Sequence, residues 1–250
     1  MRVATFNIHH GTVAKDGPVD PRQLAEVCAS FDADVLALEE VDLGTYRTGR
    51  ADLAAIVARA CAMEHVFGPA RRFPGGWYGN ALLVRGAVRS WSDAPLPRVP
   101  AWRRWQERRI GLEAQVVVDG TELGVVVTHL AVEREVSSVQ LHELLRRAGR
   151  TRPTVVLGDL NLRPSVVKPM AEAAGFTVVD HAHTSPAPGP PNKSIDHVVV
   201  SAGVTVTASD VRVTPMSDHA ALLVDLVVDP VVTQAVGAGR DPRAIAEAGR

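Results

Sequence analysis

Short apolar runs rich in Val, Ile and Leu recur along this chain of 250 residues, and polar or turn-forming residues bound each of them. Runs of this length and composition are typical of β-strands. We expect strands over residues 3–8, 34–38, 80–84, 112–118, 123–129, 154–157, 195–200, 211–214 and 220–228. None approaches the ~18–20 residues of a membrane span. The pattern therefore predicts packed sheets around a water-excluding core.

Helical patterns lie between some of these runs. We expect helices over residues 21–31, 51–62, 137–148 and 166–174. Pro21 follows Asp20 at a favourable first helical position, and Gly175 suits the end of the last helix. Strands and helices intermixed over a length that one domain can cover predict an α+β layered domain.

We place the domain at residues 1–229 and a C-terminal tail at 230–250. Part of this tail, residues 241–248, fits a terminal helix, and the alternatives are a disordered or vector-derived tail. Two proline-rich stretches, 92–109 and 181–193, are predicted surface loops. Loops of this length in a compact domain are usually functional or mobile.

Composition narrows the class of protein. Hydrophobic residues make up 46% and charged residues 22%, which argues against global disorder. The net charge of −1 does not favour nucleic-acid binding, although a local basic patch stays open. The N-terminus lacks the apolar core of a signal peptide, so we expect a cytoplasmic protein. We also expect a monomer. Cys28 and Cys61 are too few for a disulfide scaffold, and we expect both to be buried.

Rare polar residues stand at one end of several apolar runs. Four runs end in such residues and two later runs begin with them. If the strands alternate in direction, these ends and starts meet at one rim of the sheets. The residues are Asn7, Glu40, His129, Asp159, Asn161, Asp196, Asp218 and His219.

This set of side chains has a chemical meaning. Carboxylate and amide oxygens without thiolates suit Mg²⁺ or Mn²⁺, and histidines beside carboxylates suit proton transfer. Together they indicate metal-assisted hydrolysis of a phosphate ester. Any one Asp or Asn at a strand end is more often a turn former, so the hypothesis depends on their coincidence. Strand alternation predicts that Glu39 and Glu40 point to opposite faces, so that only one lines the site.

Several segments together resemble the endonuclease/exonuclease/phosphatase superfamily, which includes deoxyribonuclease-I-like nucleases, inositol-polyphosphate phosphatases and bacterial sphingomyelinases. The segments are TFNIHHG (5–11), DVLALEEVD (34–42), YGNALLV (78–84), VVVTHL (125–130), VVLGDLN (155–161), SIDHVVVS (194–201) and SDHAALLVDL (217–226). The resemblance covers nearly the whole chain. It implies a four-layer α/β/β/α sandwich with two mixed sheets packed face to face.

The resemblance also implies roles for residues. Asn7 and Glu40 would hold the divalent metal, with Asp218 binding metal or orienting a histidine. The residues assigned to catalysis are Asp159, Asn161, His129, His219, Asp196 and Asn80. Asp159 would orient or deprotonate the attacking water, Asn161 and His129 would contact the phosphate, and His219 would bind or protonate phosphoryl oxygens. The family's usual glutamine before the metal glutamate is replaced by Glu39.

The stretch 102–109 interleaves tryptophans with arginines. Arg103, Arg104 and Arg108 could hold phosphates while the rings stack on a base or a lipid edge. The alternative is a solvated loop whose tryptophans pack on the sheet. Arg109 precedes a strand at a place where the family often carries an arginine. The pair His9–His10 and the histidines at 181 and 183 match no closed structural zinc site, so we do not predict one.

We therefore predict an Mg²⁺- or Mn²⁺-dependent phosphoesterase acting on a small molecule or a lipid headgroup. A DNA or RNA nuclease is the alternative, since the Arg/Trp loop favours it while the near-neutral charge does not. A non-catalytic binding module on the same fold is a second alternative. Such a module would be expected to have lost Asp159, Asn161 or His219, and this chain keeps all three.

Overall fold

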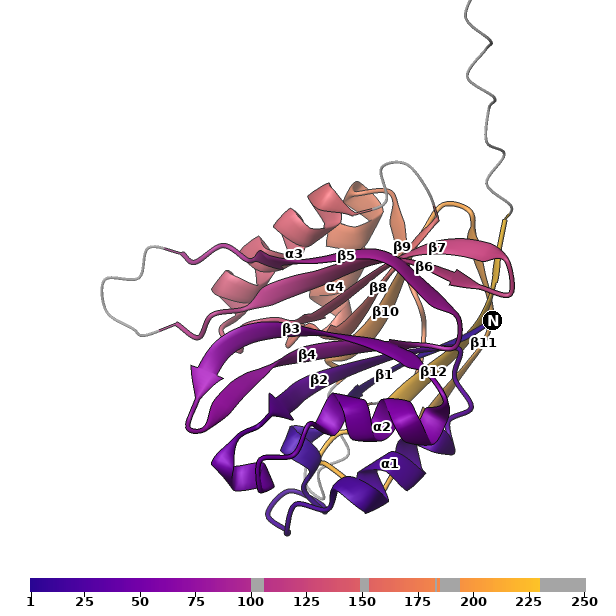
Figure 1. Cartoon of the computed structure of the whole chain (residues 1–250). Coiled ribbons are helices and arrows are strands. Elements are labelled where there is room, and N and C mark those ends of the chain that lie inside the picture. The colour runs from indigo at the N-terminus through magenta and orange to yellow at the C-terminus, as the bar shows by residue number, and fades with distance from the viewer. Residues whose placement is uncertain (100–105, 149–152, 183, 185–193, 230–250) are drawn as a thin grey trace, which may run out of the picture.

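Two six-stranded β-sheets pack face to face in the computed structural model of the chain (Figure 1). The structure describes residues 1–99, 106–148, 153–182, 184 and 194–229. In spatial order the first sheet consists of β11 (Val204–Arg212), β12 (Ala221–Val228), β1 (Arg2–Asn7), β2 (Val35–Leu43), β4 (Gly76–Val84) and β3 (Glu64–Phe73). The second consists of β5 (Ala87–Pro95), β6 (Ile110–Val118), β7 (Thr121–His129), β8 (Thr154–Asp159), β10 (Asp196–Ser201) and β9 (Phe176–Val178).

The two sheets share one pairing pattern at their centres. β1 runs parallel to β2, and β7 runs parallel to β8. β12 is antiparallel to β1, and β10 is antiparallel to β8. The expectation that the strands simply alternate in direction is therefore wrong for the two parallel pairs. The polar residues still reach one rim, because parallel strands end side by side and an antiparallel neighbour begins where they end.

Helices cover the outer face of each sheet (Figure 1). α1 (Pro21–Ala29) and α2 (Leu53–Cys61) pack on the first sheet, and α3 (Arg134–Arg147) and α4 (Pro164–Ala173) pack on the second. Two 3₁₀ turns, η1 (His9–Gly11) and η2 (Tyr46–Thr48), follow β1 and β2. Asp20 caps α1 by accepting hydrogen bonds from the Arg22 and Gln23 amides, and this satisfies donors that the first helical turn leaves free. The predicted four-layer sandwich is confirmed.

The core follows the period-two alternation of the strands. The cluster between the two sheets includes Val3, Val125, Val155 and Val198. The next residue along each of these strands points to the opposite face and packs under the helices. Burial of each such valine contributes about 1.5–3 kcal/mol of transfer free energy. Packing between the sheets thus fixes which face of each central strand points inward. A residue at the strand end that continues this alternation points to the same side.

Three strands were not predicted. β3 contains Gly68 and Pro69, β5 is polar and largely exposed, and β9 has only three residues. All three are edge strands in their sheets, where one-sided burial weakens the hydrophobic pattern. The predicted loop over 92–109 is consequently wrong at its start, because residues 92–95 belong to β5.

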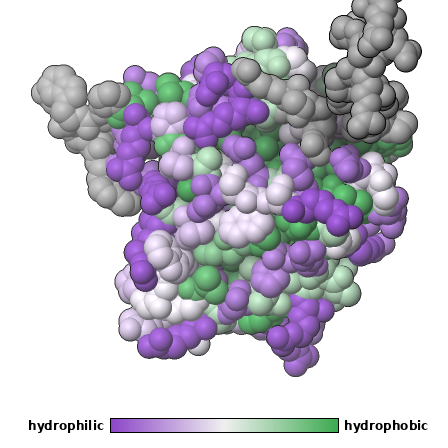
Figure 2. Space-filling model, turned by 45° about the horizontal axis from the view of Figure 1, so that its top comes forward, coloured by the Kyte–Doolittle hydropathy of each residue, from purple (hydrophilic) through white to green (hydrophobic). Residues whose placement is uncertain are grey.

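Other predictions concern the ends and the surface. Residues 230–250 and most of the loop at 181–193 lie outside the described residues, so the division at 229 stays a prediction. Cys28 is buried as expected, while Cys61 is only partly buried. Within the described ranges, no helix combines the length and apolar character of a membrane span. Figure 2 shows hydrophilic and hydrophobic residues intermingled over one face of the molecule.

Candidate active site

The candidate site lies where the inter-sheet faces of four central strands reach the rim. Asn7 continues the face of Val3 on β1, and Asp159 continues the face of Val155 on β8. By the same alternation, His129 ends β7 and Asp196 begins β10 on the inter-sheet side. These four residues are buried, with exposed fractions of 1–5%. The fold therefore gathers them from both sheets into one cluster of buried polar side chains.

The carboxylate of Asp159 is the centre of this group. Asn7 Nδ2 donates a hydrogen bond to Asp159 Oδ2 across the two sheets at 3.1 Å. His129 Nε2 and His219 Nε2 approach the same oxygen to 3.5 Å and 3.9 Å. The other oxygen, Oδ1, accepts a hydrogen bond from the Asn161 amide. Asp159 thus has a fixed orientation and two imidazoles within reach of one carboxylate oxygen.

His219 is held from behind by a second carboxylate. Both oxygens of Asp196 lie 2.9–3.0 Å from His219 Nδ1, so that nitrogen carries a proton toward Asp196 and Nε2 faces Asp159. The His219 amide is hydrogen-bonded to Ser217 Oγ, which itself donates to the Asn7 carbonyl. Ser217 had no predicted role, although it stands in the Ser-Asp-His segment. It ties the start of β12 to the end of β1.

Burial and neighbouring charges shift the pKa values of these groups. Burial, reinforced by repulsion from Asp196, raises the pKa of Asp159 to about 7. Burial alone would lower the pKa of His219, but Asp196, Asp159 and Asp218 outweigh it and raise that pKa to about 10. Burial, with Arg109 adding to it, lowers the pKa of His129 well below the usual range. Near neutral pH, the site therefore combines a cationic His219, a neutral His129 and a carboxyl group that titrates in this range.

The two adjacent glutamates do not alternate as predicted. Thr5 Oγ1 donates a hydrogen bond to Glu39, and Asn7 Nδ2 donates one to Glu40. Thr5 and Asn7 lie on one face of β1, so both glutamates reach that face. The cause is a β-bulge between Leu38 and Val41, in which Glu40 adopts a positive φ of 59°.

The glutamates differ in their exposure instead. Glu39 is fully buried, and burial with the repulsion of Asp196 raises its pKa well above the usual range. This shift favours the neutral acid over the carboxylate. Glu40 is partly exposed at the rim, where it can reach a bound ion.

The two asparagines predicted in catalysis occupy different positions. Asn161 has a positive φ of 51° and donates its side-chain Nδ2 to the Leu130 carbonyl, which directs it beside Asp159. Asn80 is 3% exposed on β4, in register with Gly68 of β3. Its alternation with Leu82 and Val84, which lie in the inter-sheet core, places it on the inter-sheet face.

The predicted metal ligands are only partly in contact. Asn7 is hydrogen-bonded to Glu40, but the Asp218 carboxylate lies 3.7 Å from His9 Nδ1. Among the residues that the structure describes, two groups of side chains bring potential ligand atoms within 4.8 Å of one another. One consists of Asp159, Asp196 and His219, and the other of His9, His10 and Glu40. The buried Asp/Asp/His group could hold a metal ion, since its paired carboxylates repel each other unless a positive charge is near.

The predicted arginines are divided by the structure. Arg103 and Arg104 lie outside the described residues, and Arg108 is exposed. Arg109 is buried and pairs with Glu107 at 3.0 Å, and Glu107 also pairs with Arg71. Its effect on the pKa of His129 indicates that Arg109 lies near the site. Glu107 was not predicted, because a single acidic residue in an arginine-rich loop carries no pattern.

His197 is adjacent to the site but faces away from it. Its side chain is fully buried, and its Nε2 donates a hydrogen bond to the Leu162 carbonyl at 2.8 Å. It alternates with Asp196 and so lies on the face that packs under α3 and α4. Burial lowers the pKa of His197 from 6.5 to about 4.

This shift predicts a pH dependence of stability. Between pH 6.5 and 4 the unfolded chain binds a proton on residue 197 before the native state does, so stability falls as the pH falls. The shift corresponds to about 3 kcal/mol. Urea unfolding measures the free energy of unfolding at pH 7 and at pH 4. The decrease between these two pH values should be smaller by this amount in His197→Gln than in the wild type. Parallel curves for the two proteins would contradict the assignment of a buried neutral histidine.

Comparison with known proteins defines the class. Residues 4–219 match the model of the Endonuclease/Exonuclease/phosphatase family. The chain therefore belongs to this family, whose hydrolases act on phosphate ester bonds and usually depend on a metal. A comparison with curated proteins finds no match.

Solved structures show the same fold. An endonuclease/exonuclease/phosphatase from Beutenbergia cavernae DSM 12333 is 24% identical, with a TM-score of 0.74, covering 92% of this chain and 72% of that one. A mannosyl-6-phosphatase of Bacteroides thetaiotaomicron VPI-5482 is 16% identical, with a TM-score of 0.68 and coverage of 91% and 99%. TDP2 of D. rerio, complexed with single strand DNA product, is 16% identical, with a TM-score of 0.66 and coverage of 91% and 99%. The similar structures thus span different substrates.

Proposed function

We propose that this protein is an Mg²⁺- or Mn²⁺-dependent phosphoesterase that hydrolyses its substrate by in-line attack of water activated by Asp159. The observation that supports this most is the Asp159 carboxylate itself. It is buried at the rim between the two sheets, and Asn7, His129 and His219 surround one of its oxygens. A structural turn residue would not need two imidazoles beside it.

The side chains divide the work of the reaction. Asp159 accepts the proton of the attacking water, because its raised pKa brings its basicity close to the operating pH. His219, protonated and held by Asp196, places a positive N–H at Nε2 against the charge that builds on the phosphoryl oxygens. Neutral His129 and the Asn161 amide side chain add uncharged donors beside it.

The oxygen-rich rim fits a hard divalent cation. Glu40 and Asn7 would hold it, with Asp218 nearby, and it would supply positive charge that neutralises the phosphate and stabilises the leaving oxygen. These residues fit such a cation. Glu40 is a partly exposed carboxylate at the rim where the carboxylates of Asp159 and Asp196 are buried, so oxygen ligands and negative charge lie close together.

The substrate that we favour is a small molecule or a lipid headgroup, because a net charge of −1 does not favour binding to a nucleic acid. A nuclease is the second candidate. It is supported by arginines stacked on aromatic rings at the β3–β4 end, where Arg72 lies 4.1 Å from the Trp77 ring and Arg47 lies 4.0 Å from the Phe73 ring.

A substrate panel tests the proposal. Purified full-length protein with Mg²⁺ or Mn²⁺ is assayed against aryl phosphate monoesters and diesters, phosphoinositides, plasmid DNA and RNA. Hydrolysis of a small or lipid phosphate, lost on chelation and restored by the cation, supports the favoured substrate class. Preferential cleavage of DNA or RNA supports the nuclease, and turnover that survives chelation contradicts the metal requirement.

The pH profile tests the roles of the charged pair. Activity should rise as Asp159 loses its proton and fall as His219 loses its own, giving a bell-shaped profile. Asp196→Asn removes a negative charge that raises both pKa values. Both limbs of the pH–rate profile should therefore move to lower pH in this variant. A profile that keeps both limbs in place would show that Asp196 does not set these pKa values.

A further inference from the structure

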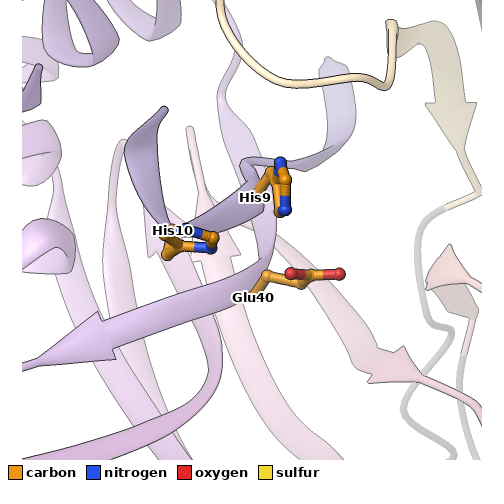
Figure 3. Close-up of side chains that lie close together, drawn as sticks. All are labelled: His9, His10 and Glu40. Carbon is orange, nitrogen blue, oxygen red and sulfur yellow. The ribbon is translucent and has the colours of Figure 1, made fainter. Parts of the chain in front are cut away.

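A second group of potential ligands lies beside the proposed cation position. His9 and His10 form the 3₁₀ turn η1 directly after β1, and Glu40 lies in the bulge of β2. One nitrogen or oxygen atom from each of the three lies within 4.8 Å of the others. Figure 3 shows the two imidazole rings beside the Glu40 carboxylate. Their ring centroids are 4.5 Å apart, with an interplanar angle of 75°.

All three residues have a backbone conformation that side chains disfavour. The φ angles are 42° for His9, 47° for His10 and 59° for Glu40. Such residues carry backbone strain, and they cluster where function requires a fixed geometry. Two hydrogen bonds hold the turn in place, from the Ile8 amide to the Glu39 carbonyl and from the His9 amide to Asn7 Oδ1. The strained turn brings both rings to Glu40.

The imidazoles also have the surroundings of metal ligands. His10 Nδ1 is buried and has no hydrogen-bond partner among the described residues. His9 Nδ1 lies 3.2 Å from Thr12 Oγ1 and 3.7 Å from Asp218 Oδ1. A hydroxyl and a carboxylate at one ring nitrogen orient the ring and leave the other nitrogen for an ion.

We infer that His9, His10 and Glu40 form an open binding site for a divalent transition-metal ion such as Zn²⁺ or Co²⁺. Imidazole nitrogens bind such ions well, whereas Mg²⁺ prefers oxygen ligands. Two histidines and one carboxylate leave at least one coordination position free. This transition-metal site differs from the Mg²⁺ or Mn²⁺ site of the proposed function, which Glu40 and Asn7 would form. The two sites have only Glu40 in common. Sequence spacing did not indicate it, because the third ligand comes from β2.

Cobalt binding tests the site without an assay of activity. Metal-free full-length protein is titrated with Co²⁺, and the visible absorption bands of the ion and its dissociation constant are measured. His9→Ala and His10→Ala should each weaken Co²⁺ binding at least ~10-fold, as expected when a metal ligand or its support is removed. His142→Ala removes an exposed histidine on α3 and should bind like the wild type. Mg²⁺ affinity should stay near the wild-type value in all three.

A second measurement does not depend on the folding of variants. Wild-type crystals soaked in Zn²⁺ should show an anomalous-scattering peak in contact with His9, His10 and Glu40. A peak only at Asp159, Asp196 and His219, or unchanged Co²⁺ binding in folded His9→Ala and His10→Ala, would overturn the inference. Asp159→Asn separates it from the proposed function, since this variant should lose hydrolysis and keep the cobalt bands.

Discussion

Replacing Asp159 by Asn should lower turnover by at least ~10²–10³-fold, because an amide cannot accept the proton of the attacking water. The amide preserves the shape of the side chain and can still meet the Asn161 amide and the His129 ring. Substrate binding should therefore change little, so that kcat falls and KM stays nearly constant. The buried carboxyl has a pKa of about 7, and its removal should also abolish the acidic limb of the pH–rate profile.

Steady-state kinetics of the purified variant check this expectation, with thermal unfolding as a control for folding. Burial and the repulsion of Asp196 disfavour the charged form of Asp159, so its replacement by a neutral amide should leave the protein folded. Near-normal turnover in the folded variant would show that another group activates the water.

Replacing His219 by Ala should also lower turnover by ~10²–10³-fold, the usual cost of one lost electrostatic donor. It removes the positive charge that lowers the pKa of Asp159. The acidic limb of the profile should therefore move to higher pH, which adds to the loss of rate at neutral pH. The alkaline limb, which reports His219, should disappear.

His142→Ala is the matched control, since this exposed histidine lies on α3 and away from the inter-sheet rim. Kinetics of the two histidine variants from pH 5 to 10 measure both the rate and the limbs. An alkaline limb that persists in His219→Ala would assign that limb to another residue, and equal losses in both variants would indicate a general effect on folding.

The strand ends made much of the site predictable from sequence. Apolar alternation fixes which face of β1, β7, β8 and β10 is buried between the sheets, and Asn7, His129, Asp159 and Asp196 simply continue that alternation. Residue order therefore predicted that they meet at one rim, although the strand directions assumed for that prediction were wrong for the two parallel pairs. The family resemblance supplied their expected roles, which the proposed experiments address.

Strand alternation failed to predict side-chain directions where the backbone is irregular. The bulge at Glu40 turned both glutamates to one face, and the strained turn at His9 and His10 brought imidazoles to a carboxylate from another strand. Such features depend on pairing between strands that are distant in sequence. Edge strands such as β5 were missed for a related reason, since their exposed polar faces lack the apolar pattern of central strands.

The role of Asp159 is tested most directly by hydrolysis of the phosphate-ester panel in ¹⁸O-labelled water by the wild type and by Asp159→Asn. We predict cation-dependent turnover of at least one ester by the wild type, with ¹⁸O incorporated into the phosphate product, and a loss of at least ~10²-fold in the variant. Label in the alcohol product, or equal turnover by both proteins, would contradict attack on phosphorus by a water that Asp159 activates.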